Sequence, residues 1–270
     1  MSIIHGCIKL TVATIILSLQ ARPAYSGIKN IGHRVAAGRG EFHSHLPENS
    51  ISALKEALTG TSYKGRPLQF HPDFVYMEFD VQETADGELV LFHDGNLTRM
   101  LPQNEKNKGA ISKIVEEISK SSGAESKTPS YDKLKIHDLT INQLKSLVMA
   151  NSEDERIPTL EEFLQKCREW WLFKPMTLEI KDIYSDEARE KLLDLLAYYR
   201  DIWMPRFQII FEKGYDMDPS GVSLMSFKAK FKKSYKQKNK KLKKYWCNKI
   251  DQYGFHKVYR SMFHRDNLCS

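Results

Sequence analysis

The sequence predicts an α/β fold built from parallel strand–helix units. Six short strand-like segments alternate along the chain with amphipathic stretches that are long enough to form helices. Single strands that alternate with helices are typical of a parallel sheet covered by helices. The chain of 270 residues is also long enough to form one large domain around a single core.

Each element can be placed from its pattern of apolar residues. The strand-like segments are residues 28–34, 75–81, 89–93, 176–181, 207–211 and 222–227. The helix-like segments are residues 50–58, 139–149, 159–171, 185–200 and much of 228–250. The pair Asp86-Gly87 between the second and third strands is a strong turn signal. We therefore expect these two strands to be joined by a tight turn.

Residues 95–156 form a long, polar connection with weak periodicity. Its middle, Gln103–Lys135, is rich in Lys, Ser, Glu and Asn, which is typical of a mobile surface excursion. The connection follows the strand 89–93 directly, so it is placed to overhang a site at that strand's end as a lid or substrate-shaping loop. We treat 95–156 as a polar insertion in the fold.

Acidic and imidazole side chains stand at the ends of two otherwise apolar strands. Because side chains alternate between the faces of a strand, Glu78 and Asp80 share one face of segment 75–81. His93 stands at the end of segment 89–93. Acids at such positions cost free energy unless a cation meets them. These residues are therefore either solvated strand ends or parts of a site.

Five motifs in a fixed order point to a known family. They are Ile31–Arg34, Pro47–Ser50, Glu78–Asp94, Ile157–Leu164 and Leu178–Lys181. Together they resemble the glycerophosphodiester phosphodiesterase family over roughly residues 28–181. The resemblance implies a (β/α)8 barrel of the TIM type, and the alternation of single strands with helices agrees with it. Such barrels carry their chemistry at the carboxyl ends of the strands.

The resemblance weakens in the carboxyl-terminal third of the chain. Ser223–Phe227 is similar to the family's fifth strand, but too few residues follow it for three more strand–helix units. Gly254–Tyr259 offers one further strand. We therefore expect a barrel that is incomplete or irregular at its carboxyl-terminal end.

The resemblance implies a divalent metal held by Glu78, Asp80 and Glu179. Three carboxylates without Cys or a dedicated His among them select Ca²⁺ or Mg²⁺ over softer metals. Such a cation would also offset the cost of gathering three acids in one pocket. The alternative is that the three acids form buried ion pairs without a metal.

The resemblance also implies which residues act on the substrate. His33 and His93 match the family's catalytic histidines, and imidazole titrates near neutral pH, so one can accept a proton while the other donates one. Arg34 and Lys181 suit phosphate oxygens. Glu48 either hydrogen-bonds a glycerol hydroxyl, acts as a further metal ligand, or stabilises the start of the following helix.

The chain departs from the family pattern next to His33. Val35 stands where the family has glycine after the His-Arg pair, and valine disfavours the backbone angles that glycine adopts. We therefore expect a reshaped backbone in the long loop Val35–Leu46. Two further histidines in this loop, His43 and His45, are expected to be solvated.

Residues 1–26 have the pattern of a secretory signal peptide. The apolar run Leu10–Leu19 is followed by small residues at the positions that a signal peptidase inspects. We expect cleavage near Ser26-Gly27, export to the periplasm or the medium, and a mature catalytic domain of residues 27–270. The alternative is an uncleaved amino-terminal anchor.

The positive charge of the chain is concentrated in one segment. The net charge is +7, and residues 228–250 contain eleven lysines and no acid, interleaved with aromatic residues. We expect Lys228–Lys249 to contact an anionic membrane surface, with a solvated helix face as the alternative. Nucleic acid is a weaker candidate, because an exported protein meets lipid headgroups more readily.

These features predict an exported, metal-dependent phosphodiesterase. By the resemblance, it would hydrolyse glycerophosphodiesters to glycerol 3-phosphate and an alcohol through acid–base catalysis by histidine. A second interpretation keeps the site but makes the substrate a lysophospholipid or another membrane lipid. A third is a catalytically silent binding module with a truncated barrel, although the retained site residues argue against it.

Overall fold

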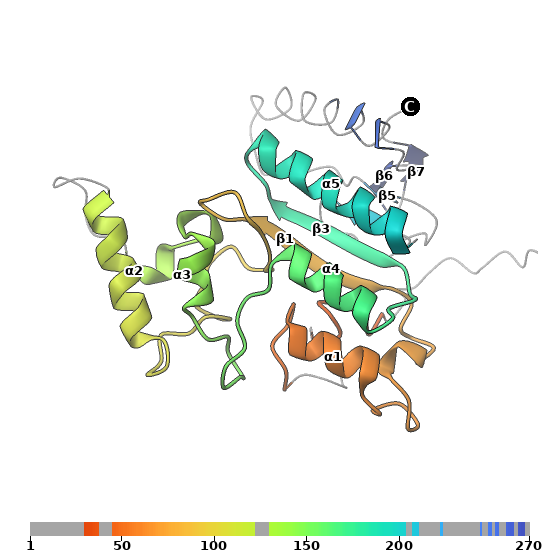
Figure 1. Ribbon diagram of the computed structural model, residues 1–270, viewed down its shortest axis with the longest axis horizontal. Helices are drawn as coiled ribbons and strands as arrows, with labels where there is room; N and C mark the ends of the chain where they lie inside the picture. The colour runs from red at the N-terminus through yellow and green to blue at the C-terminus, as the bar shows by residue number, and fades with distance from the viewer. Residues whose placement is uncertain are drawn as a thin grey trace, which may run out of the picture.

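The computed structural model describes most of the first three-quarters of the chain in full (Figure 1). Side chains and backbone are described for residues 30–37, 45–121 and 130–203. Beyond these, the described parts are the backbones of strands 207–210, 222–223, 258–261 and 264–267, and the single residues Lys244, Asn248, Lys249, Gln252 and Tyr253.

The main sheet has four strands in the order β2-β1-β3-β4. They are β1 (Met77–Glu83), β2 (Leu89–Leu91), β3 (Met176–Asp182) and β4 (Phe207–Ile210). The pairs β1–β3 and β3–β4 are parallel, as expected of a barrel built from strand–helix units. The pair β1–β2 is an antiparallel hairpin across the predicted Asp86-Gly87 turn.

The register of β1 and β3 brings acidic residues of the two strands side by side. Asp80 lies opposite Glu179, and Glu78 lies opposite Thr177. Every residue of β1 is buried, including its acids. The parallel pairing thus gathers three carboxylates on one part of the sheet, which sets up the site described below.

Helices α1 (Ile51–Thr59), α4 (Leu160–Glu169) and α5 (Asp186–Trp203) pack beside this sheet. Figure 1 shows α4 in front of β1 and β3, with α5 above it and α1 below. Phe163 on α4 contacts Phe79 on β1, with ring centroids 4.7 Å apart. The apolar face of each helix is therefore buried in one common core with the strands.

Two of these helices begin at residues that cap them. Ser50 Oγ accepts a hydrogen bond from Ala53 N–H at the start of α1. Thr159 and Glu162 form a reciprocal capping box at the start of α4, in the Ile157–Leu164 motif. The motifs noted in the sequence thus fix where these helices begin.

Residues 31–37 form turns, so the prediction of a strand over 28–34 is wrong for its described part. The reason is the backbone of Arg34, Val35 and Ala36, with φ angles of 49°, 61° and 63°, in the left-handed region. The segment still follows β1, because Glu78 N–H donates to Gly32 O. Only glycine fits at position 32, since a Cβ there would lie 2.1 Å from the Tyr76 carbonyl oxygen.

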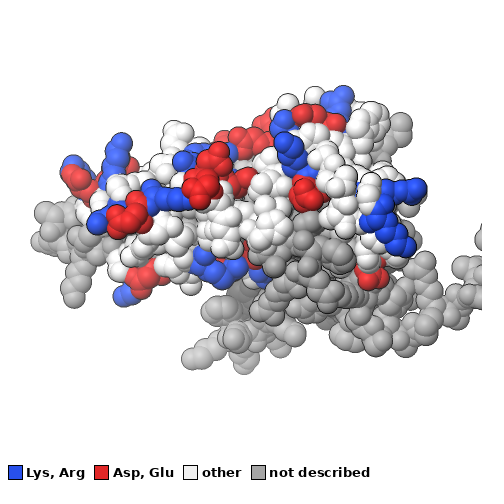
Figure 2. Space-filling view, turned by 90° about the horizontal axis from the view of Figure 1, so that it is seen from below, with Lys and Arg blue, Asp and Glu red and all other residues white. Residues whose placement is uncertain are grey.

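The insertion 95–156 is more ordered than its polar sequence suggests. It contains helix α2 (Lys108–Ser121), inside the segment Gln103–Lys135 that the sequence predicts to be a mobile surface excursion. The helix forms because Ile111 and Ile114 on one face join a second hydrophobic cluster. Figure 1 shows α2 at the left of the molecule, and Figure 2 shows acidic and basic side chains interspersed on this part of the surface.

The predicted helix 139–149 is shorter in the structure. Helix α3 covers only Ile141–Lys145, and the 3₁₀ turns η2 (Tyr131–Lys133) and η3 (Ile136–Asp138) precede it. The chain leaves the helix because the backbone of Val148 bonds instead to the buried side chain of Asn107. A further 3₁₀ turn, η1 (Leu68–Phe70), lies between α1 and β1.

The described carboxyl-terminal strands form a separate small sheet. Its order is β5-β6-β7, with β5 (Val222–Ser223), β6 (Val258–Ser261) and β7 (His264–Asn267). The pair β5–β6 is parallel and β6–β7 is antiparallel. The described strands therefore form two sheets rather than one closed ring of eight, in line with the expected irregular carboxyl-terminal end. No helix among the described residues has the length and apolar character needed to cross a bilayer.

Candidate active site

Three carboxylates from β1 and β3 meet in one cluster. Ligand oxygens of Glu78, Asp80 and Glu179 all lie within 4.8 Å of one another. Lys181 Nζ lies 2.7 Å from Glu179 Oε1 and 3.1 Å from Asp80 Oδ1. One ammonium group thus faces three acids, which leaves an excess of negative charge in a mostly buried pocket.

Each oxygen of Asp80 has one polar neighbour. Asn49 Nδ2 donates a hydrogen bond of 2.9 Å to Asp80 Oδ2. The buried Oδ1 lies 3.1 Å from Lys181 Nζ, as an ion pair. Three carboxylates within 4.8 Å of one another, with a single ammonium group beside them, are the donor set of a hard divalent cation, so these residues fit Ca²⁺ or Mg²⁺.

Without a cation, burial and mutual repulsion within this cluster shift the pKa of Glu78. Burial raises the pKa of Glu78 well above its usual value, and the neighbouring Asp80 raises it further. The Arg34 backbone N–H, 2.7 Å from Glu78 Oε2, opposes this shift. Burial alone would lower the pKa of Lys181, but Asp80 and Glu179 raise it, so the lysine stays charged.

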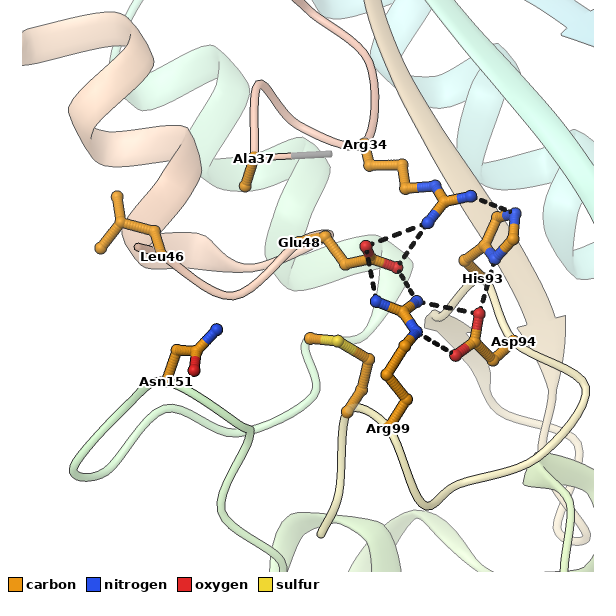
Figure 3. A pocket seen from close by; sticks show the side chains of 9 residues that line it. Arg34, Ala37, Leu46, Glu48, His93, Asp94, Arg99 and Asn151 are labelled. Carbon is orange, nitrogen blue, oxygen red and sulfur yellow. Dashed lines mark hydrogen bonds and ion pairs between the residues drawn. The ribbon is translucent and has the colours of Figure 1, made fainter. Parts of the chain in front are cut away.

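A closed ring of five side chains adjoins the acid cluster (Figure 3). Arg34 donates from Nη1 to both oxygens of Glu48 at 3.1 and 3.0 Å, and its Nη2 lies 2.6 Å from His93 Nε2. His93 Nδ1 lies 2.7 Å from Asp94 Oδ1. Arg99 completes the ring by bonding both carboxylates, Asp94 and Glu48, as the dashed lines in Figure 3 show.

This ring fixes the tautomer of His93. A guanidinium group can only donate hydrogen bonds, so His93 Nε2 must carry a lone pair toward Arg34. His93 Nδ1 then carries the proton and donates it to Asp94. The imidazole is therefore neutral, with Nε2 able to accept a proton.

Asp94 and Arg99 form a hydrogen-bonded ion pair. Burial would raise the pKa of Asp94, but hydrogen bonds from His93 and Arg99 lower it well below its usual value. Hydrogen bonds to Asp94 and Glu48 raise the pKa of Arg99 above its usual value. Both groups thus stay charged, and two guanidinium groups balance the two carboxylates of the ring, so a metal ion is not needed there.

Two cavities meet at His93. One of about 360 Å³ is lined by the ring side chains together with Ala37, Leu46, Met100 and Asn151. The other, of about 460 Å³, is lined by His93, Asp94 and Lys181 with Gln82, Gly95, Asn96 and Asp182. Because Arg99, Met100 and Asn151 belong to the insertion 95–156, the insertion forms one wall of the first cavity.

The structure brings all eight sequence-predicted site residues into two adjoining groups. Glu78, Asp80, Glu179 and Lys181 form the acid cluster, while Arg34, Glu48 and His93 belong to the ring. His33 is half-buried, with Nε2 3.8 Å from Glu78 Oε2, and so lies on the side of the acid cluster. Of the other two loop histidines, His45 is exposed and His43 lies outside the described residues.

The argument that valine at position 35 would avoid the backbone angles of glycine is wrong. Valine takes the left-handed conformation itself, at φ 61°, and is fully buried. A β-branched residue is rarely found at such angles, so the fold around it must hold this turn in place. The turn places the Arg34 N–H on Glu78 and its guanidinium on Glu48 and His93, which links the two groups.

Sequence reasoning missed Asn49, Asp94 and Arg99. The first two adjoin predicted residues, so their position next to Glu48 and His93 was an available signal. Arg99 stands in a polar insertion with many other charged residues, and nothing in its local pattern distinguishes it. Its role depends on the three-dimensional proximity of Glu48 and Asp94, which are far apart in sequence.

The chain is similar in structure to several solved proteins. A glycerophosphodiester phosphodiesterase from Thermotoga maritima is 16% identical, with a TM-score of 0.41 over 87% of this chain and 74% of that chain. A protein from Silicibacter pomeroyi described as a glycerophosphoryl diester phosphodiesterase is 14% identical, with a TM-score of 0.45 over 87% and 75%. An Oleispira antarctica phosphodiesterase, solved with the product sn-glycerol-3-phosphate, is 14% identical, with a TM-score of 0.40 over 80% and 78%.

The family comparison covers most of the chain. No curated protein sequence matches this chain. The profile of the glycerophosphoryl diester phosphodiesterase family matches residues 39–260, which spans the Pro47–Ser50 motif, the acid cluster and the ring residues other than Arg34. This confirms the family and the barrel class that the motifs predict. The chain therefore belongs to the glycerophosphoryl diester phosphodiesterase family, whose members are phosphodiester hydrolases built on a TIM barrel.

Proposed function

We propose that the chain cleaves glycerophosphodiesters to glycerol 3-phosphate and an alcohol with a divalent metal and a pair of histidines. Family membership provides the class of reaction. The observation that carries the finer proposal is the acid cluster of Glu78, Asp80 and Glu179, within 4.8 Å, beside two histidines and Arg34. This is the set of groups that phosphodiester cleavage needs at one place.

The acid cluster is the proposed metal site. Glu78, Asp80 and Glu179 would hold Ca²⁺ or Mg²⁺, and the excess of three carboxylates over one ammonium group supports this assignment. When bound, the ion would polarise a phosphate oxygen and stabilise negative charge that develops on the phosphoryl group. Lys181, which already contacts Asp80 and Glu179, is placed to bind a second phosphate oxygen.

His93 is the proposed base. Its Nε2 has a lone pair, so it can take the proton of an attacking hydroxyl, in the family's usual scheme the glycerol 2-hydroxyl. Asp94 would then stabilise the imidazolium through Nδ1. A phosphate anion competes for the Arg34 guanidinium, and this frees His93 Nε2 for the proton.

His33 is the proposed acid. Its Nε2 lies 3.8 Å from Glu78 Oε2, so the imidazole stands at the acid cluster. As the bond from phosphorus to the leaving oxygen breaks, His33 would give its proton to the departing alkoxide. The new bond from the 2-hydroxyl oxygen to phosphorus would leave a cyclic phosphate on the glycerol. Water would then open this ring with the two histidines in exchanged roles.

Glu48 is proposed to hydrogen-bond a glycerol hydroxyl. Two guanidinium groups hold both of its oxygens with four hydrogen bonds, so a glycerol hydroxyl would take the place of one of these donors. The carboxylate is thereby buried and fixed in orientation before the substrate arrives. Both are properties of a group that selects a hydroxyl pair.

Export stays a prediction for this chain. We propose cleavage near Ser26-Gly27, which the mass of the mature protein from a secreting host would test. The proposed lipid contact through Lys228–Lys249 lies almost wholly outside the described residues. Within it, Lys249 Nζ bonds Glu190 on α5 at 2.6 Å, so this lysine is engaged by the fold.

Identification of the products tests the proposed substrate class. Phosphorus NMR of reactions with glycerophosphocholine should show glycerol 3-phosphate as the phosphorus-containing product. Lysophosphatidylcholine in a parallel reaction should be turned over at least tenfold more slowly, because most of the residues that line the cavities are polar or charged and offer few contacts to an acyl chain. Faster turnover of the lysophospholipid would favour the lipid interpretation, and no turnover of either would favour a silent binding module.

A further inference from the structure

Three exposed aromatic side chains lie together at the end of the sheet opposite the active site. Trp171 is 76% exposed, Phe173 is 58% exposed and Phe70 is 48% exposed. Phe70 and Phe173 are in contact, with ring centroids 5.2 Å apart. We call these three side chains the aromatic face. Half of the large exposed apolar side chains found in the described chain belong to it.

The position of the aromatic face follows from the topology. Phe70 precedes β1, and Trp171 and Phe173 precede β3, so all three lie beyond the amino ends of these parallel strands. The active site is built farther along the same strands and on the loops that follow β2. In Figure 1 the arrowheads of β1 and β3 point toward α2 and α3, away from the loops that carry the aromatic face.

The two loops of the aromatic face are linked to each other, but their aromatic side chains stay exposed. The buried side chain of Gln69 donates to the carbonyl of Trp171 and accepts from the N–H of Phe173, which fastens the two loops together. Trp171 itself has φ 56°, a conformation that L-residues rarely adopt. A tryptophan that a strained loop presents to solvent contributes little to the core, so it is suited to an external contact.

The charges around the aromatic face are mainly basic. Segments 63–73 and 166–174 contain five basic and two acidic residues. The cation–π pairs of the described chain all lie in these segments: Lys64 with Tyr63, Lys166 with Trp170, and Lys174 with Phe173. Figure 2 shows basic side chains gathered at the right-hand end of the molecule, the end of these loops in Figure 1.

From this combination we propose that the aromatic face docks on an anionic lipid surface. Trp and Phe side chains partition into the interface between headgroups and acyl chains, and lysines beside them attract anionic headgroups.

The proposal has a consequence for the substrate. A lipid surface at the amino ends of the strands leaves the active site on the side that faces water. The enzyme would then stay at the membrane and act on dissolved glycerophosphodiesters, which agrees with the proposed function and separates docking from catalysis. The site and the docking surface can therefore be altered independently.

Vesicle co-sedimentation tests the proposal. The mature protein should bind vesicles of phosphatidylcholine mixed with phosphatidylglycerol, and bind phosphatidylcholine alone weakly. The double variant Trp171→Ser/Phe173→Ser should bind the mixed vesicles about tenfold more weakly, since two large aromatic side chains no longer enter the interface. Its melting temperature and its hydrolysis of glycerophosphocholine should equal those of the wild type, because both side chains are exposed and far from the site.

Tyr184→Ser is the matched control. Tyr184 is 50% exposed, about as much as Phe70, but follows β3 and lies at the opposite end of the strand. This variant should bind vesicles like the wild type. The proposal is overturned if the wild type does not bind the mixed vesicles. It is also overturned if the double variant binds them as tightly as the wild type does, which is the result expected if residues 228–250 alone bind the lipid. It is also overturned if the double variant instead changes the oligomeric state, which would make this face an interface between copies.

Discussion

Single side chains set the chemistry of this site more than any element does. Arg99 holds Asp94 and Glu48, Asp94 holds His93, and this chain of contacts leaves His93 neutral with its Nε2 lone pair facing Arg34. A histidine at a strand end is common, whereas a histidine with a fixed tautomer next to a phosphate-binding guanidinium is the arrangement of a base. The predictions at this scale concern these side chains.

We predict that His33→Ala and His93→Ala each lower kcat by about a hundredfold or more. Each variant removes one partner of the proposed proton transfer while leaving the carboxylates of the acid cluster in place. Metal affinity, measured by calorimetry, should therefore change little. The control is His137→Ala, in the insertion, where the imidazole pairs with Tyr184. The assignment fails if His137→Ala is as damaging as either site variant.

We predict that Arg99→Lys and Arg99→Ala lower kcat by about tenfold or more, as expected when the partner that orients a functional histidine is lost. A single ammonium group cannot bond both oxygens of Asp94 and of Glu48 as the guanidinium does. The pH profile of kcat should shift as well, because Asp94 no longer holds the His93 Nδ1 proton in place.

The exposed Arg66→Lys serves as the control for the Arg99 variants and should keep the wild-type profile. If Arg99→Lys restored full activity with an unchanged pH profile, Arg99 would supply only charge and would have no role in positioning His93.

At the scale of elements, the sheet and the insertion contribute differently to the site. The alternation of β1 predicts correctly that Glu78 and Asp80 share a face, and the register with β3 adds Glu179. The turn at 31–37 was not predictable, because left-handed angles at Arg34, Val35 and Ala36 contradict local propensity and depend on contacts with β1.

The insertion was also only partly predictable from the sequence. Helix α2 has a weak apolar stripe of Ile111 and Ile114, and its partners come from residues up to Ile157. The sequence around α2 contains too few apolar residues for its local pattern to predict a hydrophobic core. Glu155 further ties the insertion to the fold by accepting from Ile51 N–H at the start of α1.

We predict that Asn107→Ala destabilises the protein by about 3 kcal/mol. The buried side chain donates to the carbonyls of Pro102 and Val148 and accepts from Val148 N–H, and alanine leaves these groups unpaired. Urea denaturation measures the change. Asn142→Ala, on the exposed side of α3, should cost little by comparison. Equal effects of the two variants would contradict this account of the insertion.

At the scale of the whole molecule, the fold concentrates negative charge at one end of the sheet and displays aromatic and basic groups at the other. Sequence motifs over residues 28–181 predicted the family and the barrel class, which the profile match confirms. The arrangement of the carboxyl-terminal strands was predicted only as irregular, because their pairing involves short segments far apart in sequence. Charge repulsion within the acid cluster should affect the stability of the entire fold.

We predict that the metal-free protein loses stability as pH rises. The pKa of Glu78 is raised by burial and by Asp80, so the folded chain holds this proton more tightly than the unfolded chain does. The stability that this proton contributes is fully present below the pKa of Glu78 in the unfolded chain, about 4.3. It is lost as pH rises through the raised pKa of Glu78 in the folded chain. Denaturation in chelator across this pH range measures it.

The variant Glu78→Gln isolates this effect. It should remove this part of the pH dependence and be more stable than the wild type in chelator at neutral pH, because the variant has no charge to bury. Saturating Ca²⁺ or Mg²⁺ should reverse the order of the two proteins. The proposed environment of Glu78 would be contradicted if the stability of the wild type in chelator rose with pH and Glu78→Gln showed the same pH dependence.

Metal-dependent hydrolysis of glycerophosphocholine by the purified mature protein is the most direct test of the central claim. Chelation should abolish release of glycerol 3-phosphate, and Ca²⁺ or Mg²⁺ should restore it. Glu179→Gln should need much more metal for half-maximal activity, because one of three ligands is lost, while Glu162→Gln on the exposed side of α4 should not. Full activity in chelated, metal-free protein, or equal metal requirements in Glu179→Gln and the wild type, would contradict the assignment of the acid cluster as the metal site.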